Sequence, residues 1–151
     1  MNKKYLVVFV AISATWANIV FAETQKVDNI SYGVVVEQNQ EIALANGITV
    51  STGGLSHATA VNNEDGTTSS QWCRGTQASK DGTLLGGGGY CSIINQEGDM
   101  FWVWFGGGKW GMIGGTGAYE GATGGGTTEN VSQSPDGRSF INQSTGKIKT
   151  K

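Results

Sequence analysis

The chain has 151 residues, and its 10 Lys and Arg against 12 Asp and Glu give a formal net charge of −2. This mildly acidic balance lacks the basic surface that nucleic acids require, so no nucleic-acid partner is expected. The length supports one domain with a core of its own, and Gly, at 25 positions, is the most unusual component of the composition.

The first 22 residues follow the plan of a secretory signal peptide. Lys3 and Lys4 precede an apolar run over residues 5–12, and Val20 and Ala22 lie where a signal peptidase selects small residues. A short membrane anchor is the alternative interpretation, but polar residues interrupt the apolar stretch, which is shorter than a bilayer span. We therefore expect cleavage after Ala22, a secreted or periplasmic protein, and no integral membrane span once the signal is removed.

Residues 23–29 are polar, and we expect them to form a flexible N-terminal segment ahead of a single domain over residues 30–151. Within that domain, strand-like runs alternate with turn signals. The turn signals are Asp65-Gly66, Asp81-Gly82, Gly98 before Asp99, and Pro135-Asp136-Gly137. Asp-Gly pairs supply the positive φ angles that tight hairpin turns require.

β-Branched and aromatic residues concentrate in the segments between these turns. The segments are residues 30–37, 48–51, 56–61, 67–74, 90–95, 100–105, 127–132 and 139–149. Past the signal, no stretch has a sustained helical period, apart from a brief ambiguity over residues 41–45. Many short strands with regular turn signals predict an all-β sandwich or barrel, and the lack of alternating helices argues against a parallel sheet.

The segment MFWVWF, residues 100–105, is apolar on both faces. Strand alternation gives two sets, Phe101, Val103 and Phe105 on one face and Met100, Trp102 and Trp104 on the other. A strand with one face in water would be polar on that face. Packing against a terminal segment or a second protomer is the favoured cover for the second set, and an aromatic wall for a ligand is the alternative.

Two cysteines, Cys73 and Cys91, lie in the part that we expect to be exported. An even number of Cys in an oxidising compartment predicts one disulfide, worth about 3 kcal/mol. A redox pair would need the closely spaced Cys-x-x-Cys arrangement, and a metal site would need more ligands than the single histidine, His57. We predict a structural disulfide, no metal site and no cofactor.

Residues 114–126 read GGTGAYEGATGGG. A dinucleotide-binding loop would need a further Gly where Glu120 stands and a helix after it, and a phosphate loop would need a following Gly-Lys-Ser/Thr. A flexible linker fits poorly because Tyr119 and Ala122 are packing residues. The remaining interpretation is a sharp corner between strands, where glycine permits bends and close approach of two backbones.

The same stretch resembles the signature G-G-T-G-x-[FY]-x-x-A-x-G of the allene oxide cyclase and dirigent barrels. The glycines concerned, and their neighbours in the corner, are Gly114, Gly115, Gly117, Gly121 and Gly124, with Tyr119 and Ala122 at the packing positions. The resemblance extends over roughly residues 48–149 and is to small secreted bacterial proteins of that superfamily. It implies a single antiparallel closed barrel of about eight strands, often oligomeric, with a lumen able to hold an apolar small molecule.

No catalytic residue is assigned from the sequence. His57 belongs to the alternating set Leu55, His57, Thr59 and Val61, and if that set faces the lumen it sits among apolar groups. A hydrogen-bonded structural role is favoured for His57 over a catalytic one. Glu37 is favoured as a solvated strand end, with an acid or base at a barrel mouth as the alternative. The candidate ligand or partner surface is Met100, Trp102, Trp104, Tyr119, His57 and Glu37.

Three functions remain open at this level. The leading one is a secreted or periplasmic barrel that binds an apolar small molecule or a protein partner without strong catalysis. The second is an isomerase or cyclase of the allene oxide cyclase or dirigent type. The third is a structural, self-associating envelope protein. A homo-oligomer is one candidate assembly, and a non-enzymatic role is favoured over an enzymatic one.

Overall fold

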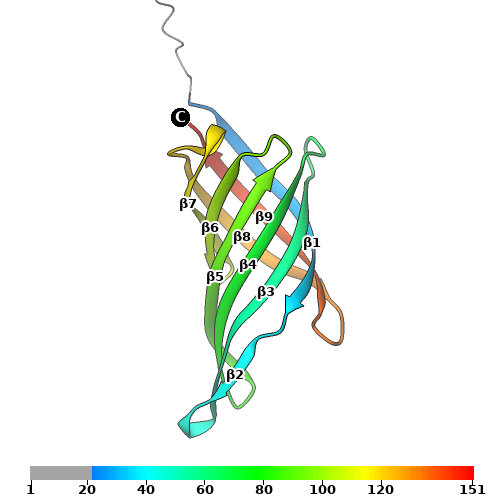
Figure 1. Cartoon of the computed structure of the whole chain (residues 1–151), viewed down its shortest axis with the longest axis vertical. Helices are drawn as coiled ribbons and strands as arrows, with labels where there is room; N and C mark the ends of the chain where they lie inside the picture. Colours follow the sequence, from blue (N-terminus) through cyan, green and yellow to red (C-terminus); the bar gives the residue numbers. More distant parts are fainter. Residues whose placement is uncertain (1–21) are drawn as a thin grey trace, which may run out of the picture.

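The computed structural model describes residues 22–151 (Figure 1). The predicted signal peptide, residues 1–22, lies outside these residues except for Ala22. The strands are β1 (Thr24–Glu37), β2 (Gln40–Ala43), β3 (Ile48–Asn62), β4 (Thr68–Lys80), β5 (Thr83–Asn95), β6 (Met100–Gly106), β7 (Lys109–Gly115), β8 (Thr123–Gln133) and β9 (Ser139–Lys149). Two short 3-10 turns are η1 (Ala45–Gly47) and η2 (Gly117–Tyr119). Within this part of the chain, no helix is long and apolar enough to cross a membrane.

Eight strands form a closed antiparallel barrel. They are paired in the order β1-β9-β8-β7-β6-β5-β4-β3, and β1 returns to pair with β3, which closes the ring. β2 lies outside the ring and extends the edge of β3 through pairs such as Ile42 with Val50. The predicted eight-stranded closed barrel is confirmed, with β2 as an addition.

The first half of β1 occupies the place of the expected flexible segment. Residues 24–29 pair one by one with the end of β9, from Thr24 opposite Lys149 to Asn29 opposite Ser144. Asn29 also lies opposite Asn62 of β3, so this half of β1 contributes to the seam that closes the barrel. Polar composition does not exclude a strand here, because the pairing uses backbone groups that every such residue has.

Two other boundaries differ from the prediction. Segments 48–51 and 56–61 are parts of one strand, β3, and an irregularity between Thr52 and Leu55 interrupts its pairing with β4. β7 has no counterpart among the predicted segments, because three of the seven residues in KWGMIGG are glycine, which weakens a strand signal. The number of predicted segments therefore matches the number of barrel strands only because one strand is split and another is missing.

The glycine-rich stretch 114–126 contains the corner between β7 and β8, as predicted, and the corner itself spans residues 116–122. Gly117 has a φ of +55°, and a Cβ added there would collide with the carboxylate of Asp99. The same carboxylate accepts a hydrogen bond from the backbone N–H of Ala118 (3.1 Å). Because Asp99 belongs to the β5–β6 turn, this contact fixes the corner to the neighbouring hairpin.

The corner contributes to the hydrophobic core. The core residues are Val27, Cys91, Ile93, Phe101, Val103, Trp110, Tyr119, Ala122 and Ile148. The rings of Tyr119 and Phe101 pack with their centroids 4.4 Å apart. Figure 1 shows the corner at the end of the barrel where the C-terminus and the start of β1 also lie, opposite β2. We call this end the closed end and the opposite one the open end.

Candidate functional site in the barrel lumen

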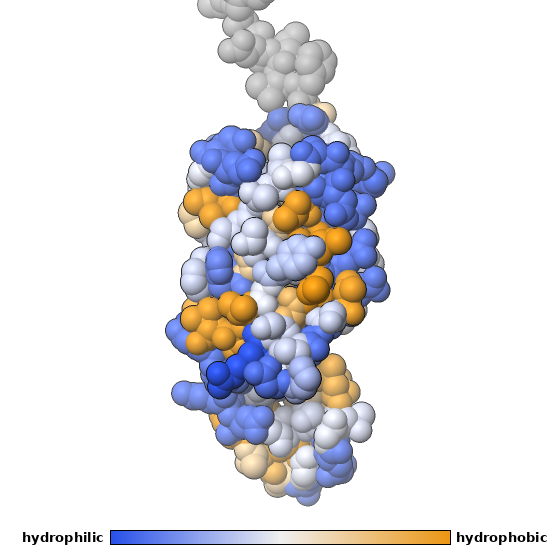
Figure 2. All heavy atoms as spheres, turned by 90° about the vertical axis from the view of Figure 1, so that its right-hand side faces the viewer, coloured by the Kyte–Doolittle hydropathy of each residue, from blue (hydrophilic) through white to orange (hydrophobic). Residues whose placement is uncertain are grey.

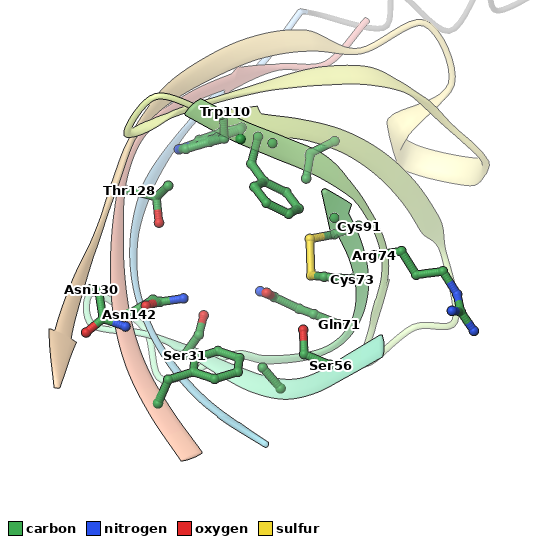
Figure 3. A pocket seen from close by; sticks show the side chains of 18 of the residues that line it. Ser31, Ser56, Gln71, Cys73, Arg74, Cys91, Trp110, Thr128, Asn130 and Asn142 are labelled. Atoms are coloured by element: carbon green, nitrogen blue, oxygen red, sulfur yellow. A yellow bond between two sulfur atoms is a disulfide. The ribbon is translucent and has the colours of Figure 1, made fainter. Parts of the chain in front are cut away.

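A cavity of about 700 Å³ occupies the interior of the barrel toward the open end (Figure 3). Its mouth is lined by residues from the end of β1, the β1–β2 connection, the β6–β7 turn and the β8–β9 turn, namely Glu37, Asn39, Gly107, Gly108 and Gly137. Pockets for small organic ligands have volumes of about 300–1,000 Å³. The lumen therefore has the size of a small-molecule site.

Strands β5, β6 and β7 give the lumen an apolar side. We define the apolar wall as Cys91, Ile93, Phe101, Val103, Phe105 and Trp110. Trp110 donates its indole N–H to the backbone carbonyl of Thr145 (3.2 Å), so its polar atom is already bonded. This wall presents aromatic and aliphatic carbon, which suits a flat apolar group.

Strands β8, β9, β1, β3 and β4 give the lumen a polar side. We define the polar wall as Thr128, Asn142, Ser31, Ser56 and Gln71, which Figure 3 shows around the lumen. Ser31 lies directly opposite Asn142 across the β1–β9 pair, and Gln71 lies opposite Ala58 of β3. Ala58 is short and buried, so the side chain of Gln71 extends into the lumen past it. These five residues are uncharged. The same strands also contribute apolar lining residues, such as Val35 and Phe140, and three exposed charged ones, Glu37, Arg74 and Glu129.

Cys73 and Cys91 form the predicted disulfide. The two residues lie directly opposite each other on β4 and β5, where the polar wall meets the apolar wall. Both line the cavity, and Figure 3 shows the bond on the inner side of the barrel. The disulfide therefore ties together the two strands that carry chemically different sides of the lumen.

Glu37 and Arg74 form an ion pair at the mouth. Nη2 of Arg74 lies 3.0 Å from Oε2 of Glu37, and Nη1 donates to the backbone carbonyl of Gly53 (2.6 Å). Both side chains are about half exposed, and Figure 3 shows Arg74 directed away from the lumen. Exposed pairs contribute only about 0–1 kcal/mol to stability. The main consequence of this pair is that the carboxylate at the rim already has a partner.

His57 lies on the outside of the barrel. Its Nε2 is 2.9 Å from Oγ of Ser70, and its ring centroid is 4.3 Å from that of Trp72. The buried residues of this part of β3 are its neighbours Ala58 and Ala60, at 4% and 1% exposure. A lumen position for His57 requires its alternating set to face inward. The small residues Ala58 and Ala60 face inward instead, so His57 does not lie in the lumen.

Met100, Trp102 and Trp104 lie on the opposite face of β6 from the apolar wall. Trp102 is 38% and Trp104 is 41% exposed. Trp102 and Trp72 both lie opposite Ser92, and Trp104 lies opposite Tyr90. We call Trp72, Tyr90, Trp102 and Trp104 the outer aromatic face. Figure 2 shows hydrophobic groups among hydrophilic ones on another side of the molecule, the one on the right in Figure 1. On β1, Val34 and Val36 are also exposed.

A second cavity, of about 220 Å³, is lined in part by residues of the closed end, including Tyr119. The residues shared by both cavities are Val27, Asn29, Ser69, Phe101 and Ile148. Within residues 22–151, Oδ1 of Asn29 is the single buried side-chain oxygen or nitrogen without a hydrogen-bond partner.

Burial raises the pKa of the Tyr119 phenol above its usual value. Tyr119, which the sequence places in the candidate ligand or partner surface, lines the smaller cavity at the closed end and not the larger one.

None of the polar-wall residues is among the candidate site residues predicted from the sequence. On β1 the polar residue faces inward and the apolar one outward, since Ser31 is 5% exposed and the adjacent Tyr32 is 54% exposed. In a half-buried strand the apolar set normally faces the core. Alternation of small polar and larger apolar residues is compatible with a polar lumen. The sequence does not show which of the two sets faces inward, so the pattern alone does not predict one.

The fold is that of a dirigent-like β-barrel. It is similar to the structure of the pterocarpan synthase dirigent protein GePTS1, with a TM-score of 0.58 and 13% identity over 96% of this chain and 99% of that chain. It is also similar to the pterocarpan synthase dirigent protein PsPTS1, with a TM-score of 0.53 and 11% identity over 83% of this chain and 94% of that chain. No family model and no curated protein matches the sequence.

The resemblance noted for residues 114–124 is thus confirmed as a likeness of fold. The bacterial origin that accompanied it stays a prediction, as do the roles of the candidate site residues.

Proposed function

We propose that this protein binds a small molecule in its lumen, with the ligand's apolar part against the apolar wall and without strong catalysis by the chain. The observation that supports this most directly is the cavity of about 700 Å³ inside a closed barrel, with a mouth at the open end. A site that removes a ligand from water on several sides gains affinity from buried apolar area. The disulfide is compatible with an extracellular location, and secretion or export to the periplasm is part of the proposal.

The chemistry of the lining favours binding over acid–base catalysis. General acid–base catalysis needs a titratable side chain within hydrogen-bond reach of the reacting atom. The carboxylates among the lining residues are Glu37, which is paired with Arg74, and Glu129, which is exposed on β8. His57, the one histidine of the chain, lies outside the lumen. The polar wall offers hydroxyl and amide groups, which orient a ligand without accepting its proton.

An isomerase or cyclase is the second candidate. The specific observation in its favour is the likeness to two proteins described as pterocarpan synthase dirigent proteins. A closed lumen can hold a reactive intermediate in one conformation, and such positioning accelerates or directs a reaction with few catalytic groups. Turnover of an unsaturated epoxide by the purified protein would support this candidate.

The neutral fluorescent probe N-phenyl-1-naphthylamine tests the lumen directly. We expect saturable binding of one probe per chain, with a fluorescence increase from the apolar wall. Ser56→Phe places a ring in the lumen and should weaken binding at least about tenfold, because the ring occupies the ligand's volume. Thr59→Phe, at an exposed position on the same strand, is the matched control and should bind as the original protein does. Equal binding by both variants would remove the lumen from the proposal.

A second copy of this chain is the proposed partner of the outer aromatic face. Its four aromatic side chains are between 38% and 65% exposed, which is more apolar surface than a solitary barrel needs to present. Trp102→Ser with Trp104→Ser should shift the assembly toward monomer in analytical ultracentrifugation. An unchanged sedimentation coefficient, or a monomer in both proteins, would contradict the proposed self-association.

A further inference from the structure

We infer that the ligand is uncharged and carries hydrogen-bonding groups along one edge, and that the carboxamides of Gln71 and Asn142 select it. This inference rests on the proposed lumen function and narrows the class of ligand from apolar to amphipathic. Figure 3 shows the two side chains pointing toward one another from opposite sides of the lumen. Asn142 comes from β9 and Gln71 from β4, with β1 and β3 between them.

The two carboxamides have no partner of their own. Within residues 22–151, neither side chain forms a hydrogen bond with another protein group, although many other polar side chains in the same barrel do. Each carboxamide offers two N–H donors and an acceptor oxygen. Polar groups without a protein partner normally bind water, so a ligand that fills the lumen must replace those hydrogen bonds.

A purely apolar ligand would therefore bind at a disadvantage. It would gain contact with the apolar wall but would leave two carboxamides and the hydroxyls of Ser31 and Ser56 without partners. Desolvated polar groups that lose hydrogen bonds weaken binding, whereas a matched donor and acceptor recover it. A ligand with one flat apolar face and a polar opposite edge satisfies both walls at once.

A charged ligand is disfavoured for a different reason. The polar wall contains only amide and hydroxyl groups, and the cation nearest the mouth, Arg74, is engaged by Glu37 and by the carbonyl of Gly53. A carboxylate in the lumen would lose its hydration without gaining an opposite charge. Glu129, the other charged lining residue, is an exposed anion and offers an anionic ligand no opposite charge. The lining therefore favours neutral molecules over anions of the same shape.

Three naphthalene derivatives of similar shape test the inference by displacement of N-phenyl-1-naphthylamine at pH 7. They are 2-naphthamide, which is neutral with donors and an acceptor, 2-naphthoate, which is an anion, and 2-ethylnaphthalene, which is apolar. We expect 2-naphthamide to displace the probe at concentrations at least about tenfold lower than the other two. This ranking needs only the unmodified protein, so it holds as a test even where a variant fails to fold.

The double variant Gln71→Leu/Asn142→Leu tests the residues. We expect the preference for 2-naphthamide over 2-ethylnaphthalene to fall below about threefold, because the matched hydrogen bonds are gone. Gln143→Leu is the matched control: it removes a carboxamide from the next position of β9, where the side chain contacts Asp28 outside the lumen. That control should keep the original preference.

The outcomes separate the inference from the function beneath it. Saturable probe binding with equal displacement by all three compounds would overturn the inference and leave the lumen site standing. Displacement by 2-naphthoate as effective as by 2-naphthamide would overturn the exclusion of charge. A preference that survives Gln71→Leu/Asn142→Leu would overturn the assignment of these residues. Absence of saturable probe binding would overturn the proposed function itself.

Discussion

The two ends of the barrel are built from the same strands, yet one is packed around Tyr119 and the other encloses most of the larger cavity. At the closed end, β6 places Phe101 against Tyr119 of the corner, and both are 9% exposed. Toward the open end, the lumen lining includes Gly75, Gly86, Gly87 and Gly88, which have no side chains to fill it. Side-chain volume rather than strand topology therefore decides whether a barrel interior is packed or hollow.

Phe105 shows how an aromatic residue can line a cavity without closing it. A Cβ added to Gly89 would lie 2.7 Å from the Phe105 ring, and one added to Gly75 would lie 3.4 Å from it. The ring therefore lies close to the bare backbone of β4 and β5 while it lines the cavity. A Cβ at Gly89 would also collide with the backbone carbonyl oxygen of Arg74, so glycine at this position permits both the strand pairing and the position of the ring.

The largest predicted effect comes from truncating one phenylalanine at each end. Phe101→Ala removes a buried ring of the core and should lower the free energy of unfolding by about 3–5 kcal/mol. Phe105→Ala, four positions along the same strand, removes a ring that is only half-buried and should cost only about 1–2 kcal/mol. Urea denaturation of both variants measures the difference. Equal losses would mean that the two ends are packed alike.

The disulfide between the two walls has the next largest effect. Cys73→Ser with Cys91→Ser removes a cross-link over a sequence separation of 18 residues, and we expect a loss of about 3 kcal/mol in the free energy of unfolding. Reduction of the unmodified protein should give a similar loss when both are followed by the same denaturation. Two titratable thiols in the native oxidised protein would show that the bond is absent in solution.

The structure of the closed end could be predicted from the sequence more completely than that of the open end. The corner over residues 114–126 and the alternation of β6 both depend on local rules, namely positive φ at glycine and opposite faces in a strand. The lumen depends on a non-local fact, the direction of each face after closure. Ser31, Gln71 and Asn142 are ordinary strand residues until β1 pairs with β3. His57 shows the same limit. The sequence predicts that it alternates with its neighbours along a strand, but not whether its face of the strand points into the barrel.

A substitution at Asn29, where the two cavities meet, should have a smaller effect on stability and tests the packing between the two ends. Oδ1 of Asn29 is buried without a partner where both cavities meet. Asn29→Leu keeps a similar volume and removes that group, so it should raise the free energy of unfolding by about 1 kcal/mol. Asn29→Asp is the paired control and should lower it, because it buries a charge at the same place. Destabilisation by leucine would mean that the carboxamide makes a hydrogen bond in solution.

The smallest predicted effect is an alkaline one at the closed end. Burial raises the pKa of Tyr119 above its usual value near 10, because the ionised phenolate loses hydration in the folded state. The unfolded chain therefore releases this proton first as the pH rises, and the stability that Tyr119 contributes is complete below pH 10 and declines above it. Tyr119→Phe keeps the ring on Phe101 but has no proton to release. Measured from pH 8 to pH 11, the free energy of unfolding should fall less steeply for Tyr119→Phe than for the original protein. Parallel curves would mean that the phenol reaches water, and the closed end would then be as open to solvent as the mouth.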